Sequence, residues 1–246
     1  MKHLPERLFY RGNPELLQRS KMAIVGSRKP TAYTRQMTAL LASSLSRRGI
    51  CIVSGAAMGV DAIAHKSAGA HHTIAVMANG VDIRYPAINA KLIERIENEG
   101  LVLSRFNPGE RARPWSFVVR NEMVVALGDA LIVTQAQHNS GTMRSVEFAQ
   151  AMGKKIYVLP HRIGESEGSN ALLARGEAEV IYDIEAFCDA LAPLSAPIDD
   201  EVLLYCKNAP DYEEAYRRFG TKLFEYELEG KIKIHNAKVY LASERV

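Results

Sequence analysis

Short apolar runs alternate with helical patterns from residue 21 to about residue 192, and this alternation restricts the possible folds more than any other feature. The runs are rich in Val, Ile and Ala and are apolar at consecutive positions, which is typical of strands buried on both faces. Strands that alternate with helices form a parallel sheet with helices on both faces. The sequence therefore predicts an α/β protein with an open parallel sheet of the Rossmann-like type.

The predicted strands and helices locate the loops that can carry function. Strands are predicted at about 23–25, 50–54, 73–78, 101–104, 130–134, 155–159 and 180–182. Helices are predicted between them at about 34–48, 59–69, 89–99, 118–127, 142–152, 170–175 and 184–191. Ligands of open parallel sheets bind outside the carboxyl ends of the strands, so the loops that follow strands are the first candidates for a site.

The regions on either side of this alternation differ from it. Residues 1–20 are polar and interrupted by Pro and Gly, and we expect an arm that lies against the domain of residues 21–192. Residues 193–198 are expected to be a linker. Residues 199–246 show three helical segments and a hairpin pattern around Asn236 and Ala237, the outline of a small winged-helix-like domain. Acidic residues crowd its first half, so DNA binding and protein contact both stay open as its role.

Charge and cysteine content narrow the class of function. The net charge is +3 over 246 residues, divided as +5 over the first 195 residues and −2 over the rest, so a polyanion site belongs in the first part. Three widely spaced cysteines, Cys51, Cys188 and Cys206, exclude a disulfide framework and a zinc site of familiar spacing. The sequence has no apolar signal segment and no apolar run near the ~20 residues of a membrane span. We expect a cytoplasmic protein without a metal, a cofactor or a membrane contact.

The first predicted strand leads into a turn suited to an anion. Gly26 permits a tight turn, and Ser27, Arg28 and Lys29 place a hydroxyl and two cations at its mouth, just before a long helical pattern. A helix N-terminus presents free backbone N–H groups and a partial positive charge. The turn is therefore a candidate phosphate site, and a plain turn with a solvated Arg-Lys pair is the alternative.

The loop after the fifth predicted strand repeats this logic. Ser140, Gly141 and Thr142 place backbone amides and hydroxyls at the start of the next helical pattern. Two such turns at neighbouring strand ends would hold a sugar–phosphate backbone and not only a single phosphate.

The segment 105–121 combines cations with aromatic rings. The residues concerned are Arg105, Phe106, Arg111, Arg113, Trp115, Phe117 and Arg120, followed by Asn121. Cations that neutralise phosphates, beside rings on which bases stack, are what a site for single-stranded nucleic acid requires. The alternative is that the rings anchor this loop in the core and the arginines are solvated.

Asp61 and His65 follow the second predicted strand at a spacing of four residues, which places both on one face of a helix. They are either an acid–base pair or a structural contact that fixes the preceding loop, and we expect the structural contact.

Several blocks of the sequence, taken together, resemble the DNA-processing protein A family. The resemblance covers roughly residues 15–190, and the C-terminal part resembles the family's winged-helix-like domain. The blocks are, in order, Leu17 with Ala-Ile-Val-Gly-Ser-Arg28-x-x-Thr31, Ser54-Gly-Ala-Ala-x-Gly-x-Asp61-x-x-Ala-His65, Ala75-Val with Gly80-x-Asp82-x-x-Tyr-Pro86, Pro108-Gly109, Phe117-x-x-Arg120-Asn121 and Ser140-Gly141-Thr142. Separate blocks in the same order are more specific than any one of them.

The resemblance implies a function that composition alone does not indicate. Members of the family are bacterial proteins that bind single-stranded DNA, protect incoming strands during natural transformation and help to load RecA onto them. They are homodimers and are not known as enzymes. Two departures matter here: we expect the family's N-terminal helical extension to be missing, and Glu122 stands where the family has a basic residue after Arg-Asn.

The residue patterns and the resemblance together predict one nucleic-acid site and no catalytic residues. The predicted site consists of Gly26, Ser27, Arg28, Lys29, Arg111, Arg113, Phe117, Arg120, Asn121, Ser140, Gly141 and Thr142.

Three other classes of protein are alternatives to this prediction. A dinucleotide-binding enzyme needs G-x-G-x-x-G after the first strand and an acid at the end of the second, and the sequence has neither. A nucleotide phosphoribohydrolase similar to the lysine-decarboxylase-like family needs P-G-G-x-G-T-x-x-E. Here His138-Asn-Ser-Gly-Thr142 lacks the two leading glycines, and the nearest acid is Glu147. This hydrolase is the main alternative, and a scaffold protein is the third class.

Overall fold

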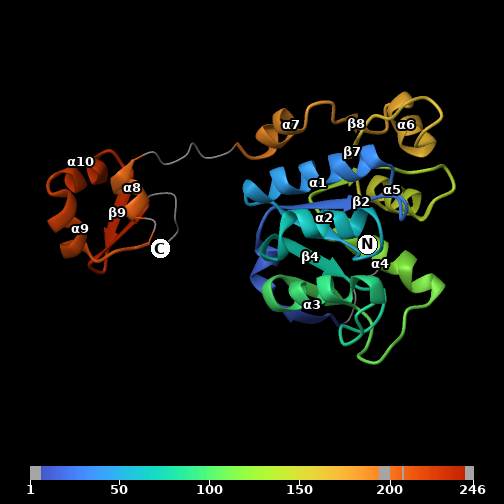
Figure 1. Cartoon of the computed structure of the whole chain (residues 1–246), viewed down its shortest axis with the longest axis horizontal. Helices are drawn as coiled ribbons and strands as arrows, with labels where there is room; N and C mark the ends of the chain where they lie inside the picture. The colour runs from blue at the N-terminus through green and yellow to red at the C-terminus, as the bar shows by residue number, and fades with distance from the viewer. Residues whose placement is uncertain (1–6, 194–199, 207, 242–246) are drawn as a thin grey trace. The chain divides into compact units, whose positions relative to one another are not determined.

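The computed structural model describes residues 7–193, 200–206 and 208–241, and it divides into two compact units. Among the described residues, the first unit contains residues 7–193 and the second contains residues 200–206 and 208–241 (Figure 1). The predicted linker, residues 193–198, lies outside the described residues except for Pro193.

The first unit is built on one mostly parallel sheet. Its strand order is β1-β5-β4-β3-β2-β6-β7-β8, and every neighbouring pair is parallel except the antiparallel pair of β1 and β5. The strands are β1 (Phe9–Gly12), β2 (Lys21–Val25), β3 (Cys51–Ser54), β4 (Thr73–Val76), β5 (Leu101–Ser104), β6 (Ala130–Val133), β7 (Ile156–Val158) and β8 (Glu179–Val180). The predicted Rossmann-like fold class is confirmed, with one antiparallel edge strand added.

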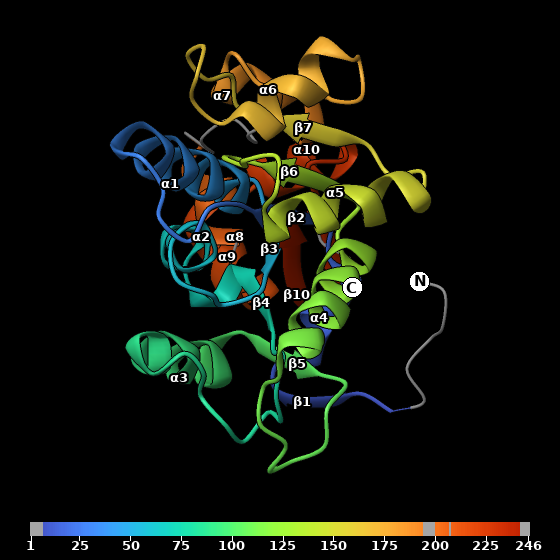
Figure 2. The ribbon, with the colours of Figure 1, turned by 90° about the vertical axis from the view of Figure 1, so that its right-hand side faces the viewer.

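Helices cover both faces of this sheet (Figures 1 and 2). They are α1 (Ala32–Arg47), α2 (Val60–Ala68), α3 (Ala90–Glu99), α4 (Pro114–Leu127), α5 (Gly141–Ala151), α6 (Glu167–Ala174) and α7 (Ile184–Leu191), with short 3-10 turns η1 (Pro14–Gln18), η2 (Ala70–His72) and η3 (Ala87–Asn89). Alternate residues of one strand serve opposite faces: Ile24 of β2 packs with Leu41 of α1, whereas Val25 packs with Val124 of α4. This two-sided burial explains why the strand sequences are continuously apolar.

The start of the chain contributes more than the arm expected for residues 1–20. Residues 9–12 form β1 at the edge of the sheet, with Phe9 paired to Ser104 and Gly12 to Leu101. Leu16 of η1 is almost completely buried in the core. The strand could not be read from the sequence because three of its four residues are exposed, so it shows no apolar run.

Helix α4 begins earlier than the predicted residue 118. Pro114 occupies its first turn, where a missing backbone N–H costs nothing, and the Arg113 N–H donates to Ser116 Oγ at 2.9 Å. Trp115 and Phe117 therefore belong to the first turn of a helix and not to a loop, which corrects the prediction that placed them in a loop.

The second unit has the predicted order of elements. It contains α8 (Glu201–Cys206), α9 (Tyr212–Phe219), α10 (Lys222–Leu228) and a hairpin of β9 (Ile232–His235) with β10 (Lys238–Leu241). Asn236 and Ala237 form the two-residue turn, both with positive φ, as a twisted hairpin requires. Its own core includes Val202, Leu223 and Val239. That this unit is a winged-helix domain remains a prediction.

The sequence predicts neither a membrane-spanning segment nor a metal site. None of the helices described is both long and apolar enough to cross a membrane. Within the same residues, no group of three or more His, Cys, Asp or Glu side chains is arranged to hold a metal ion.

Candidate nucleic-acid interface

A pocket of about 530 Å³ lies where the order of the sheet reverses. The chain leaves β2 toward β3 on one side and returns to β6 on the other, so the loops after β2 and β6 separate at this point. Such a switch point is where open parallel sheets bind ligands. Nine of the twelve predicted site residues line the pocket: Gly26, Ser27, Arg28, Phe117, Arg120, Asn121, Ser140, Gly141 and Thr142.

The other three predicted residues lie outside this lining. Lys29 is exposed, and its backbone N–H donates to Ser27 Oγ at 3.1 Å. Arg111 and Arg113 are exposed in the segment that leads into α4. The structure therefore separates the predicted set into nine residues at the pocket and three exposed cations beyond it.

The turn after β2 needs glycine for close packing. A Cβ atom on Gly26 would lie 2.7 Å from Val60 Cγ2 and 3.0 Å from Thr134 Oγ1, so the backbone approaches α2 and β6 closely. Thr31 caps α1 by accepting a hydrogen bond from the Thr34 N–H at 3.2 Å. The Thr31 N–H donates to Gln135 Oε1 at 3.0 Å, which joins the turn after β2 to the loop after β6.

The second turn forms the opposite wall of the pocket. Ser140 occupies the N-cap position of α5, and its hydroxyl donates to the Gln137 carbonyl at 2.8 Å instead of capping the helix. Asn121 Nδ2 donates to the Gly141 carbonyl at 3.4 Å, which links this turn to α4. The pocket thus lies between two strand-end turns that both contain small residues, and one wall is the N-terminus of an eleven-residue helix.

Two guanidinium groups lie close to the Phe117 ring at one side of the pocket. The Arg28 Cζ atom is 5.5 Å from the ring centroid, and the Arg120 Cζ atom is 5.9 Å from it. The Tyr85 ring lies 6.1 Å away, tilted by 50°. Phe117 is only partly buried, so it combines ring surface with neighbouring cations in the way that single strands require.

Arg120 differs from Arg28 because it is buried. Only 5% of it is exposed, and its Nη1 donates to the carbonyls of Gly55 and Val76, at the ends of β3 and β4. A Cβ atom on Gly55 would lie 2.0 Å from this guanidinium, so a side chain at this position would displace Arg120. Burial lowers the pKa of Arg120, and the neighbouring Asp61 opposes this change. Arg120 therefore forms the floor of the pocket and holds strand ends together.

Asp61 and His65 do not form an acid–base pair. Asp61 Oδ2 accepts from the N–H groups of Gly55 at 3.2 Å and Ala57 at 3.4 Å, and burial raises the Asp61 pKa against the influence of Arg120. His65 Nδ1 instead lies 2.5 Å from Thr73 Oγ1, and burial lowers its pKa to about 3. Both residues have the structural role that we expected.

The other two aromatic residues of segment 105–121, Phe106 and Trp115, differ in burial. Phe106 is 5% exposed and anchors the loop, whereas Trp115 is 51% exposed and packs edge-on against Phe106 with 5.7 Å between ring centroids. Asp82, which the site prediction did not include, also fixes this loop. Both of its carboxylate oxygens accept from the Gly109 N–H, at 2.9 and 2.8 Å.

Five polar residues that line the pocket were not in the site prediction: Asp61, Gln135, Gln137, Arg144 and Ser145. Gln135 and Gln137 lie in the loop after β6, and Arg144 and Ser145 lie within the first five residues of α5. Position at a strand end or in a first helical turn was the available signal, but it does not say which side chains turn toward a pocket.

The acid required by the hydrolase alternative is elsewhere. Glu147 is exposed and forms an ion pair with Arg144 at 2.8 Å. It is not among the described residues that line the pocket.

The fold and the pocket define a Rossmann-like α/β protein with two small-residue turns, and a phenylalanine ring close to two arginines, at its switch point. Residues 1–192 match the model of the DNA recombination-mediator protein A family, and the chain belongs to this family. The relatives are named for the processing of DNA and not for a catalysed reaction, in agreement with the expectation of a protein that is not an enzyme.

Relatives and solved structures agree with this assignment. The DNA processing protein DprA of Streptococcus pneumoniae is 36% identical over 176 residues, which are 70% of this chain and 62% of that protein. Its X-ray structure has a TM-score of 0.69 at 33% identity and covers 75% of this chain and 65% of the solved chain. DNA processing protein A of Helicobacter pylori, solved for its single-stranded DNA binding mode, has a TM-score of 0.76 at 41% identity. The match covers 78% of this chain and 89% of the solved chain. The chain spans about half to two thirds of the curated relatives that it matches.

Proposed function

We propose that this chain binds single-stranded DNA in the switch-point pocket, in the cytoplasm, and acts there in natural transformation by protecting incoming strands. We further propose that it helps to load RecA and works as a homodimer. The observation that carries the DNA-binding proposal is that turns 26–28 and 140–142 line one pocket, with the Phe117 ring close to Arg28 and Arg120. Two such turns suit successive phosphates, and the ring suits a base.

Family membership supports the same proposal. The H. pylori relative binds single-stranded DNA, and the relatives are named DNA processing proteins. The hydrolase alternative has no comparable support, because the carboxylate that it needs is exposed and paired with Arg144. Release of a base from AMP by the purified chain would be required to revive that alternative.

Arg28→Ala tests the site because Arg28 is exposed and has room to meet a phosphate. Losing one phosphate contact should weaken binding to oligonucleotides of any sequence and reduce the slope of log K against log salt by about 0.7. Fluorescence anisotropy with a labelled single strand across a salt series measures both quantities. Arg95→Ala on α3, away from the pocket lining, is the matched control and should leave the slope unchanged. Equal slopes in the two variants would contradict the proposed site.

RecA loading and dimerisation need separate measurements. Light scattering of the purified chain should give the mass of a dimer. RecA filament formation on a single strand should be faster when the chain is already bound to it.

A further inference from the structure

Charge is divided unequally between the helices and the hairpin of the second unit. Residues 200–229 contain eight acidic and four basic residues, whereas residues 231–241 contain three lysines and no acidic residue. The acidity that argued against nucleic-acid binding by this unit therefore belongs to the helices. The hairpin of β9 and β10 is basic.

The strand register places the basic residues on one face of this hairpin. Lys233 pairs with Tyr240, and His235 pairs with Lys238. Paired residues of an antiparallel hairpin point to the same side, with their Cβ atoms about 5 Å apart. The alternate positions Ile232, Val239 and Leu241 are buried in the core of the unit. Lys233, His235, Lys238 and Tyr240 therefore form the outward face of the hairpin.

Most cations of the helices are neutralised, but the two lysines of this face are not. Arg218 pairs with Glu201 at 2.9 Å and Arg217 with Glu213 at 3.5 Å. Within residues 200–206 and 208–241, Lys233 and Lys238 have no ion pair. Asp211 pairs with Lys238 through an isolated antiparallel β-bridge. Its carboxylate accepts a hydrogen bond from the Glu213 N–H at the start of α9.

Helix α10, which precedes the hairpin, is unsuited to nucleic acid. Its exposed residues include Glu225 and Glu227, and Glu229 follows directly after its end, so the helix presents carboxylates where a phosphate would have to approach. Like charges in this position repel the backbone. The hairpin face is therefore better suited than α10 to contact nucleic acid.

We propose that the outward face of the β9–β10 hairpin, defined by Lys233, His235, Lys238 and Tyr240, is a second contact surface for single-stranded nucleic acid. The two lysines neutralise phosphates, and the partly exposed Tyr240 ring provides a surface on which one base stacks. Phosphate contacts and base stacking carry little sequence information, so we expect this face to accept any sequence. This surface goes beyond the proposed pocket and does not depend on it.

The double variant Lys233→Glu/Lys238→Glu tests this surface in the full chain. Anisotropy with a labelled oligo(dT) across a salt series should show weaker binding and a salt slope reduced by about 1.4, the value for two phosphate contacts on a single strand. Arg217→Glu/Lys222→Glu changes the net charge equally on α9 and α10 and is the matched control. Circular dichroism melts of both double variants verify that the second unit remains folded.

A slope reduced equally by both double variants, or by neither, would overturn the proposal and leave the acidic helices as the functional surface of this unit. Measuring both double variants in an Arg28→Ala background separates the contribution of the hairpin face from that of the pocket. A difference that persists there supports the hairpin surface even if the pocket is not the DNA site. Tyr240→Leu keeps apolar bulk, so a loss of about fivefold or more in affinity, with an unchanged melt, supports base stacking, and unchanged affinity contradicts it.

Discussion

Two buried side chains, Arg120 and Asp61, hold together the strand ends and the loop at the base of the pocket. The Arg120 guanidinium connects the ends of β3 and β4, and Asp61 fixes the loop between them through the N–H groups of Gly55 and Ala57. A buried charge without its partner is strongly destabilising. Replacing Arg120 would therefore disturb folding and binding together, which makes the exposed Arg28 the better probe of DNA contact.

His65 gives a pH dependence of stability with a definite sign. Its pKa is lowered to about 3 in the folded chain, against 6.5 for a free histidine, because burial disfavours the charged ring. Between these values the unfolded chain binds a proton that the folded chain excludes, so stability falls as the pH falls from 6.5 toward 3. From pH 7 to pH 5, His65 should remove about 2 kcal/mol from the free energy of unfolding.

Denaturant melts of the wild type and of His65→Gln at pH 7 and pH 5 measure this contribution. The loss on acidification should be smaller in the variant by about 2 kcal/mol. Asp61 and the other acids are common to both proteins, so their effects cancel. Equal losses in the two proteins would show that His65 is not buried as a neutral ring.

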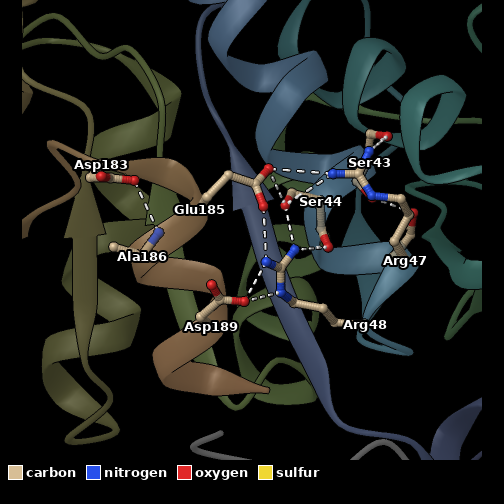
Figure 3. A network of polar contacts seen from close by, with 9 residues as sticks. Ser43, Ser44, Arg47, Arg48, Asp183, Glu185, Ala186 and Asp189 are labelled. Carbon is tan, nitrogen blue, oxygen red and sulfur yellow. Dashed lines mark hydrogen bonds and ion pairs between the residues drawn. The ribbon is translucent and has the colours of Figure 1, made fainter. Parts of the chain in front are cut away.

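At the scale of elements, a polar network joins the first and last helices of the first unit (Figure 3). Arg48, directly after α1, donates to Glu185 at 2.8 Å and to Asp189 at 2.5 Å, both on α7, and to Ser44 Oγ at 2.6 Å. The Arg48 side chain is 1% exposed, whereas both carboxylates are about half exposed. The network attaches α7, next to the end of this unit, to the C-terminal end of α1.

Arg48→Ala should lower the free energy of unfolding by about 1–2 kcal/mol, because several charged hydrogen bonds are lost while water still reaches both acids. Arg47→Ala is the matched control, since Arg47 contacts the same Glu185 at 3.3 Å from an exposed position. Its cost should stay below about 0.5 kcal/mol. Thermal melts compare the two, and similar shifts would mean that burial of Arg48 adds nothing.

Prediction from the sequence succeeded where structure is local. The seven strands from β2 to β8 and the helices between them followed from apolar runs and periodicity, and the two turns that line the pocket followed from small residues at strand ends. β1 could not be predicted, because Tyr10 and Arg11 are exposed and their partners in β5 are far along the chain. The burial of Arg120 could not be predicted either, because only packing shows that this position of α4 faces the strand ends.

At the scale of the whole molecule, the two units have separate cores. Leu41 belongs to the core of the first unit and Leu223 to that of the second, and both are completely buried. We therefore expect the units to unfold as separate cooperative blocks.

The single tryptophan, Trp115, lies in the first unit and makes this expectation testable. Leu223→Ala should destabilise the second unit by about 2–5 kcal/mol and leave the Trp115 fluorescence transition in place. Leu41→Ala, the control, should shift that transition by a similar free energy. A Trp115 transition that moves equally in both variants would show that the units unfold together.

The two outermost strands of the large sheet are short, with four residues in β1 and two in β8. An exposed sheet edge carries unpaired backbone N–H and C=O groups that can pair with a strand of another chain. A short edge strand offers few of these groups. The short edge strands of this sheet therefore disfavour edge-to-edge association of one copy of the chain with another.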